Sequence, residues 1–297
     1  MISPQAYRVL RRIVQISTVL MFCLLPWLDS MEESRFAFVR GSLFALDLAG
    51  LPFADPVGAL QVAAGGFVPG TRQLLGALLT LVLAFFMGRV FCSWICPYGF
   101  FSELVHALRR RLTGEPALEK LDKKKQARAF GLKAVIVVAG LVGAAVLGWP
   151  VLNSLAMPGE LSLTPLLIWQ NAEPTALVVL GIFALPLAAL VVEFATGKRF
   201  WCRYVCPQSV LLGLAARFLP KGMPGMRIGW QASRCSCGKD APCRKACSLG
   251  LNPRTLDGPA RRDCTMCGDC LKACASKGGA LCFQSCASAS RKKKEEA

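Results

Sequence analysis

The chain reads CTMCGDCLKAC from Cys264 to Cys274, a C-x2-C-x2-C-x3-C run of four cysteines. In bacterial iron–sulfur proteins with this spacing, three cysteines hold one cluster and the fourth reaches across to a second cluster. A second group of four lies just upstream, with the irregular spacing C-x-C-x5-C-x3-C: Cys235, Cys237, Cys243 and Cys247. Eight thiolates are enough for two [4Fe–4S] clusters, so the two groups predict a small two-cluster domain near the C-terminus.

The spacing also predicts how the two groups share their cysteines. One cluster is expected on Cys264, Cys267, Cys270 and Cys247, and the other on Cys235, Cys237, Cys243 and Cys274. The pattern departs from the usual one, because Ser248 and Ala275 stand where a proline usually follows the fourth cysteine. Cys282 and Cys286 are alternatives to Cys235 or Cys237. Structural zinc sites use C-x2-C pairs too, but zinc needs only four ligands and does not explain this spacing beside a second group.

Upstream of the cysteines the sequence is that of a membrane protein. Of its 297 residues 54% are hydrophobic, and four long stretches are almost free of charge: 13–28, 74–91, 134–151 and 175–192. Each approaches the ~17–25 residues that a helix needs to cross the hydrocarbon layer. One such stretch alone would suit a buried core helix, whereas four in one short chain predict an α-helical integral membrane protein with four transmembrane helices.

The formal net charge of +17 is distributed unevenly. Lys and Arg gather before the first stretch, between the second and third, and after the fourth, whereas the other two connections carry mainly acidic residues. By the positive-inside rule, both termini and the cysteine-rich domain are cytoplasmic, at the bacterial inner membrane. The basic residues are expected to orient helices and meet lipid headgroups, which argues against nucleic-acid binding. In that compartment thiols stay reduced, which favours metal or redox chemistry over disulfides.

The membrane part is expected to consist of two pseudo-repeats, because a C-x3-C-P motif follows the second and the fourth stretch. The cysteines of these motifs are Cys92 and Cys96 in the first half and Cys202 and Cys206 in the second. Proline disfavours a helical conformation in the residue before it, so each motif predicts a break where a span ends and a new helix begins. We expect Cys92 on the last turn of its span. The four thiols could bind a shared metal, cycle as redox pairs or contact a partner.

Composition then predicts the domains. Residues 1–219 form the membrane domain, 220–233 a linker rich in Pro and Gly, 234–286 the ferredoxin-like domain and 287–297 a charged tail. The ferredoxin-like domain has little apolar sequence, so metal binding is expected to supply much of its folding energy.

With these motifs the chain resembles the NapH family, the membrane-bound ferredoxin-type quinol dehydrogenase subunits, whose superfamily includes NosR, MauN and CcoG. The resemblance covers residues 8–283 and is strongest at Cys92-Ser93-Trp94-Ile95-Cys96-Pro97 and at 55–61. It implies electron transfer between the quinone pool and a redox partner, such as a periplasmic ferredoxin or a reductase subunit. The irregular upstream cysteine group departs from the NapH pattern.

Three functions therefore compete at this point. The first is an electron-transfer subunit, a quinol-linked oxidoreductase component with two [4Fe–4S] clusters and quinol or quinone as substrate. The second is an accessory protein that reduces or handles a metal such as copper for a respiratory enzyme. The third is a transporter or anchor with zinc-stabilised cysteines. For the first, quinol oxidation needs a proton acceptor, and Glu103 and His106 on the polar side of the helix after Pro97 are the predicted pair.

Overall fold

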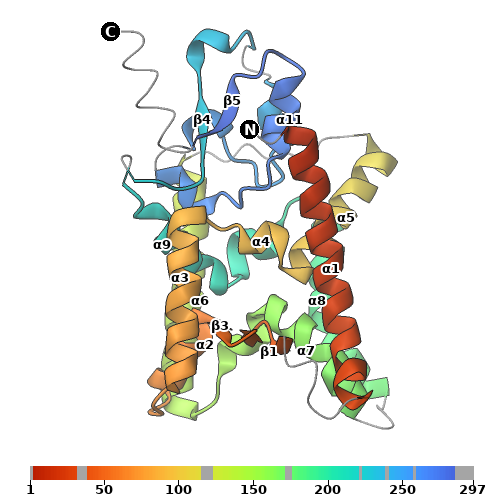
Figure 1. The fold of residues 1–297 in the computed structure, drawn as a ribbon, viewed down its shortest axis with the longest axis vertical. Coiled ribbons are helices and arrows are strands. Elements are labelled where there is room, and N and C mark those ends of the chain that lie inside the picture. Colours follow the sequence, from red (N-terminus) through yellow and green to blue (C-terminus); the bar gives the residue numbers. More distant parts are fainter. Residues whose placement is uncertain are drawn as a thin grey trace.

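The computed structural model describes residues 3–31, 39–114, 123–170, 176–220, 223–237, 241–256 and 259–284. Within these ranges the chain is mainly helical, with two small antiparallel sheets. Long helices stand roughly parallel at two sides of the molecule, short segments lie between them, and the cysteine-rich C-terminal part sits at one end (Figure 1).

The four apolar stretches lie on four long helices: α1 (Pro4–Met31), α3 (Thr71–Met87), α6 (Lys123–Leu147) and α8 (Ala176–Thr196). Each helix exposes large apolar side chains, including Ile13, Leu20, Leu75, Leu78, Val138, Val142, Leu187 and Val191. Among the described residues, one helix is both long and apolar enough to cross a membrane, over Lys124–Leu147. The 17 residues of α3 span only about 25 Å, short of the ~30 Å hydrocarbon layer. Four crossings therefore stay a prediction.

The segments between the long helices pack across the molecule. α2 (Pro56–Ala64), which lies between α1 and α3, packs against α6, and α7 (Met157–Gln170), between α6 and α8, packs against α1. In the same way α5 (Pro97–Thr113) packs against α8, and α9 (Gln208–Arg217) packs against α3. This reciprocal packing brings the two C-x3-C-P motifs to the middle of the molecule, where α4 lies in Figure 1.

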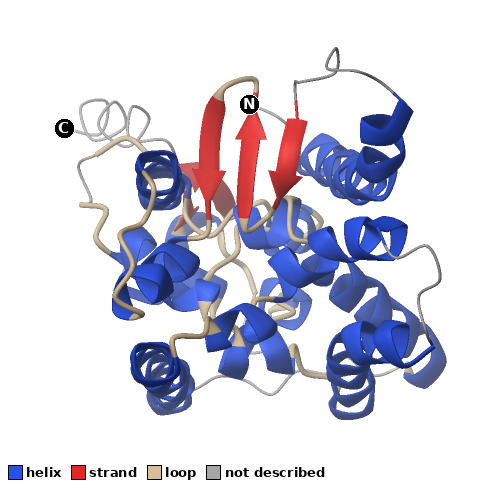
Figure 2. Cartoon of the chain, turned by 90° about the horizontal axis from the view of Figure 1, so that it is seen from below, coloured by secondary structure: helices blue, strands red, loops and turns tan. Residues whose placement is uncertain are grey.

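A three-stranded meander precedes α2 and was not expected from the sequence. It consists of β1 (Val39–Ser42), β2 (Ala45–Leu48) and β3 (Leu51–Ala54), with Leu46 paired to Phe53. Seen from below, its strands lie among the surrounding helices (Figure 2). A short 3₁₀ turn, Val151–Leu155, occupies the corresponding connection before α7. The two connections therefore differ in structure, although they join equivalent helices.

The two motifs break the helices as the prolines predict, with one correction. Cys96 is the N-cap of α5, whose first residue is Pro97, and α9 starts just after Pro207. Cys92, however, is not on the last turn of its span. Gly88 ends α3 with a φ of 75°, a conformation that favours glycine, and Cys92 lies on the separate short helix α4 (Phe91–Trp94). The second motif begins on a π-helical turn, η2 (Trp201–Val205).

The C-terminal part is organised around its cysteines. Its elements are β4 (Arg227–Trp230), α10 (Pro242–Ala246), α11 (Asp269–Ala275) and β5 (Leu281–Gln284), joined by the 3₁₀ turns Ala232–Arg234, Pro253–Thr255 and Pro259–Asp263. β4 lies inside the stretch 220–233 expected to be a linker, yet it pairs with β5, and Ile228 is 1% exposed in the same core as the cysteines. The domain boundaries otherwise stay predictions, and the tail 287–297 lies outside the described residues.

Candidate iron–sulfur centres

The loop from Cys264 to Cys270 carries three of the predicted ligands of one cluster. Helix α11 starts directly after Gly268, whose φ of 78° is in the left-handed region that favours glycine. The backbone NH of Met266 points at Cys264 Sγ, at 3.5 Å. The thiols of Cys264, Cys267 and Cys247 are near enough to the Cys270 thiol to influence it electrostatically. Cys247 thus lies in the neighbourhood of the three downstream cysteines, and its ligation of their cluster stays a prediction.

The second predicted set gathers near the C-terminal end of α11, where Cys274 lies. Cys243, on α10, lies within electrostatic range of Cys274 at the end of α11 and of Cys235. Cys237 packs against the same core, and Cys235 Sγ lies 3.9 Å from its carbonyl oxygen. Cys282 lies on β5 opposite Gly229, and Cys286 lies outside the described residues. Ligation by these cysteines stays a prediction.

The setting of these thiols suits an iron–sulfur cluster. The described cysteines are all free, and several form the domain core together with Leu256, Met266 and Leu271. Burial raises the pKa of Cys264 to about 12, so without a metal its thiol is neutral and behaves as a small apolar side chain. A metal ion deprotonates the thiols that coordinate it. The high pKa of the metal-free thiol is therefore compatible with a role as a cluster ligand. Among the described residues, no three His, Cys, Asp or Glu side chains are arranged to hold a single metal ion.

The cysteines of the two C-x3-C-P motifs form a second buried group, the four-cysteine centre: Cys92, Cys96, Cys202 and Cys206. Cys96 has the other three within electrostatic range, and Cys206 has both Cys92 and Cys202. Three of the four are less than 10% exposed. Arg89 lies beside the group, with its guanidinium 3.8 Å from Cys92 Sγ. Reciprocal packing of the two halves therefore converges on four thiols, a donor set that soft metals prefer.

The first motif also contacts the cluster loop directly. Ser93 Oγ donates to the carbonyl oxygen of Thr265 at 2.6 Å, and Gln15 donates to the Ser93 carbonyl at 2.7 Å. Tyr7 donates to the Met266 carbonyl at 2.6 Å and accepts from Trp94 Nε1 at 3.1 Å. The loop between Cys264 and Cys267 is thus held against the membrane part by four hydrogen-bonded groups.

Glu103 and His106, the predicted proton acceptors, are buried rather than on a solvated face. Glu103 is 8% exposed and pairs with Arg11 at 2.7 Å and with Arg12 at 2.9 Å. Arg11 in turn lies 3.5 Å from Asp269, at the start of α11. His106 is 9% exposed and lies 3.7 Å from Glu193 on α8. Both side chains therefore hold elements together, and their role with quinol stays a prediction.

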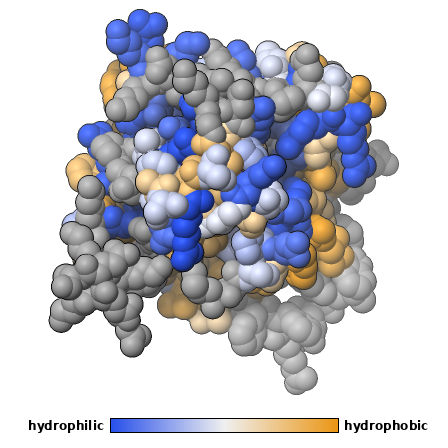
Figure 3. Space-filling model, turned by 90° about the horizontal axis from the view of Figure 1, so that it is seen from above, coloured by the Kyte–Doolittle hydropathy of each residue, from blue (hydrophilic) through white to orange (hydrophobic). Residues whose placement is uncertain are grey.

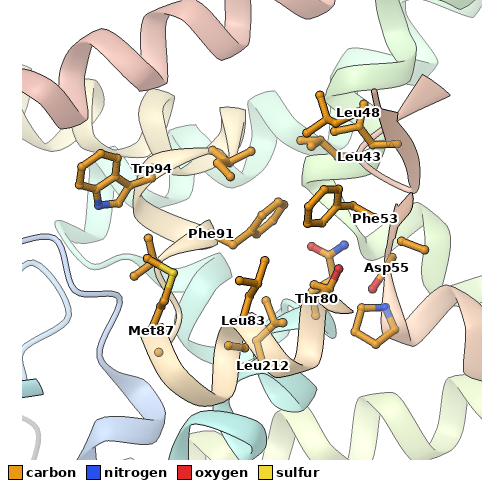
Figure 4. A pocket seen from close by; sticks show the side chains of 18 of the residues that line it. Leu43, Leu48, Phe53, Asp55, Thr80, Leu83, Met87, Phe91, Trp94 and Leu212 are labelled. Carbon is orange, nitrogen blue, oxygen red and sulfur yellow. The ribbon is translucent and has the colours of Figure 1, made fainter. Parts of the chain in front are cut away.

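Beside the first motif lies a cavity of about 330 Å³ that the sequence did not reveal. Its walls are almost wholly apolar and come from β2, β3, α3, α4 and α9. The polar groups on its wall include Asp55 and Gln208, and Asp55 stands at the end opposite Trp94 and Met87 (Figure 4). The sequence signal at Asp55 was an N-cap: an aspartate followed by proline at the start of α2.

Comparison with known proteins places both motif segments in one family. The family described as "4Fe-4S binding domain" matches residues 69–115 and 175–224, which include the four-cysteine centre and none of the eight downstream cysteines. The "Ferredoxin-type protein NapH" of Escherichia coli is 29% identical over 90% of this chain and 85% of its own length, and that of Haemophilus influenzae is 25% identical over 90% and 86%. The "Methylamine utilization ferredoxin-type protein MauN" of Paracoccus denitrificans is 27% identical over 73% and 69%. No solved structure matches the chain. The predicted relationship to the NapH and MauN ferredoxin-type proteins is confirmed.

Proposed function

We propose that this NapH- and MauN-like protein transfers electrons between the membrane quinone pool and a redox partner through two [4Fe–4S] clusters. The observation that carries the proposal is the sharing of cysteines around α11: Cys247 lies with the Cys264–Cys270 group, and Cys274 lies with Cys243. Such a neighbourhood supports the proposal, because a two-cluster ferredoxin shares its fourth cysteines in this way. Oxidation of one quinol releases two electrons, which two one-electron clusters can take up.

The proposal includes four transmembrane helices with both termini and the clusters on the cytoplasmic side. The outward apolar side chains of α1, α3, α6 and α8 support it, because a lipid-facing surface needs no polar cover. The end formed by the C-terminal part carries many hydrophilic residues, with apolar ones at its margins (Figure 3). Alkaline phosphatase fused after Glu160 should be active and fused after Lys125 inactive. Activity after Lys125 would place the clusters on the opposite side.

The four-cysteine centre is part of the proposal as an additional metal or redox site between the two halves. Its match to the 4Fe-4S binding family and the convergence of its thiols support this role. The same convergence favours the second candidate function, handling of a soft metal such as copper for a respiratory enzyme. The two functions differ in what the centre binds: resident iron and sulfide in the first, exchangeable copper in the second.

One experiment tests the proposed function. The protein is purified anaerobically, its iron and copper are counted, and electron paramagnetic resonance spectra are recorded after reduction with dithionite and, separately, with a quinol. We expect iron and sulfide for two or more clusters and cluster signals in both samples. Signals with dithionite but none with either a benzoquinol or a naphthoquinol would refute exchange with quinone. Bound copper that is released on reduction, without cluster signals, would favour the second function.

A further inference from the structure

The cavity beside the first motif has the size and chemistry of a small-molecule site. Its volume of about 330 Å³ lies within the range of ~300–1,000 Å³ typical of ligand pockets. Two aromatic side chains, Phe53 on β3 and Phe91 on α4, line it and lie next to one another near the middle of the view in Figure 4. A flat ring system could therefore pack against aromatic as well as aliphatic walls.

Asp55 gives the cavity a polar end. Its Oδ1 accepts from the backbone NH of Val57 at 2.9 Å and caps α2, but its Oδ2 is buried without a hydrogen-bond partner. The residue is 3% exposed, and both the side chain of Gln208, just after the second motif, and the backbone NH of Gly58 lie close enough to its carboxyl group to offset part of the rise in pKa that its burial causes. The Oε1 atom of Gln208 is also buried without a partner. Unsatisfied buried polar atoms cost about 1–3 kcal/mol each, so this pair indicates a ligand with matching polar groups.

The other buried carboxylates near the two motifs already have partners. Glu103 is paired with two arginines, and Glu193 accepts from Tyr98 at 3.0 Å and from the backbone NH of Trp201 at 3.1 Å. Neither lines the cavity. Asp55 is thus the buried carboxylate that lines a ligand-sized space.

The far end of the cavity touches the cluster domain. Trp94 lines the cavity and donates to Tyr7, whose hydroxyl donates to the Met266 carbonyl between Cys264 and Cys267. Gly88 lines it as well, and a Cβ placed there would lie 3.2 Å from Met266 Cε. A molecule in the cavity would therefore be separated from the downstream cysteine loop by little more than one layer of side chains.

We propose that this cavity binds the headgroup of a lipid-soluble quinol, with its ring packed against Phe53 and Phe91 and one hydroxyl donating to Asp55 Oδ2. The Gln208 amide contacts the same end of the ligand. This site rests on the proposed function and specifies where its substrate binds, in place of the interface near Glu103 and His106. Phospholipid acyl chains would also pack against the apolar walls, but they have no polar group to hydrogen-bond with Asp55 or Gln208.

The test uses the full chain in detergent with two variants and their controls. Asp55→Asn keeps a side-chain oxygen to cap α2 but replaces the acceptor with an amide, and Asp47→Asn on β2 is its control. Ala84→Phe fills the cavity from α3, and Leu78→Phe, on the outward face of the same helix, is its control. Binding of decylubiquinone and of a short-chain menaquinone analogue, and of their quinols, is measured by calorimetry. Iron content is counted for every variant.

We expect Asp55→Asn and Ala84→Phe to weaken quinol binding at least tenfold while their iron content and both controls stay at the wild-type level. Unchanged binding in Asp55→Asn and Ala84→Phe, with a wild type that binds and is reduced by quinol, would overturn this site and leave the proposed function standing. Release of tightly bound phospholipid from the wild type, with quinol affinity insensitive to Ala84→Phe, would assign the cavity to lipid. A wild type that neither binds quinol nor is reduced by it would reject the function itself.

Discussion

Ser93 Oγ lies 2.6 Å from the carbonyl oxygen of Thr265, so the first C-x3-C-P motif is hydrogen-bonded to the loop between Cys264 and Cys267. The two residues are 172 positions apart, and both are about 1–2% exposed. No solvent reaches this contact to replace a lost partner. Together with the Tyr7 hydroxyl, which donates to the Met266 carbonyl, this bond holds the cluster loop against α1 and α4.

Replacing Ser93 by alanine should loosen the cluster loop. The Thr265 carbonyl would be buried without its donor, which costs about 1–3 kcal/mol. We expect a lower thermal unfolding midpoint and faster loss of iron to a chelator. Ser276→Ala is the control, because the Ser276 hydroxyl makes a comparable bond to the Ala273 carbonyl at 3.0 Å on the exposed surface. Equal chelation rates in the two variants would show that the Ser93 bond does not hold the loop.

Cluster sharing predicts an asymmetric effect of cysteine replacement. Cys274→Ser should damage the cluster of the upstream group, because Cys274 lies beside Cys243, whereas Cys270→Ser should damage the downstream one. The two variants should lose different components of the electron paramagnetic resonance spectrum. Cys282→Ser, on β5, is the control and should keep all its iron. Iron loss in that control would mean that Cys282 replaces one of the eight predicted ligands.

Arg11 is predicted to contribute much more to stability than a surface arginine. It is fully buried and joins Glu103 on α5 to Asp269 on α11, so Arg11→Met leaves Glu103 with Arg12 and removes the arginine 3.5 Å from Asp269. Removing one partner of a buried pair typically costs 3–5 kcal/mol, and because Arg12 remains we expect a loss near the lower end, about 3 kcal/mol. Arg72→Met removes an ion pair with Asp47 in which the Arg72 side chain is 80% exposed. This substitution should lower the free energy of unfolding by only about 0–1 kcal/mol. Similar unfolding midpoints for the two variants would contradict this assignment.

The sequence predicted the long helices and the breaks at Pro97 and Pro207, because apolar length and proline act locally. It also predicted how eight cysteines share two clusters, because cluster spacing is a local constraint, and this sharing stays a prediction. The sequence did not predict contacts between segments that are far apart in the chain. The pairing of Arg11 with Glu103 and the strand at Ile228 depend on tertiary packing that periodicity does not encode.

The cavity illustrates the same limit. A lone Asp55 before a proline looks like a helix cap, and it is one, through Oδ1. Only the fold shows that β3, α3 and α4 leave an apolar space in front of its second oxygen. Sequence reasoning instead favoured Glu103 and His106, because a polar helix face suggests solvent; the structure covers that face with Arg11 and Glu193.

Asp55 should make the free energy of unfolding decrease as the pH rises, whereas a salt-bridged carboxylate makes it increase. Burial raises its pKa from 3.8 to about 6, so the folded protein binds a proton more tightly than the unfolded chain. The resulting stabilisation is complete below about pH 4 and is lost as the pH rises through 6; a difference of this size corresponds to roughly 3 kcal/mol.

Asp55→Asn is neutral at every pH, and it should therefore gain stability relative to the wild type as the pH rises from 4.5 to 8. Unfolding midpoints of both proteins across this range, in one detergent and at constant ionic strength, measure the difference. Asp47→Asn, on the neighbouring strand, controls for changes in net charge. A difference between Asp55→Asn and wild type that stays constant from pH 4.5 to 8 would show that Asp55 does not titrate in this window. Quinol at a concentration that saturates the wild type should raise the unfolding midpoint of the wild type more than that of Asp55→Asn, because the variant is expected to bind quinol at least tenfold more weakly.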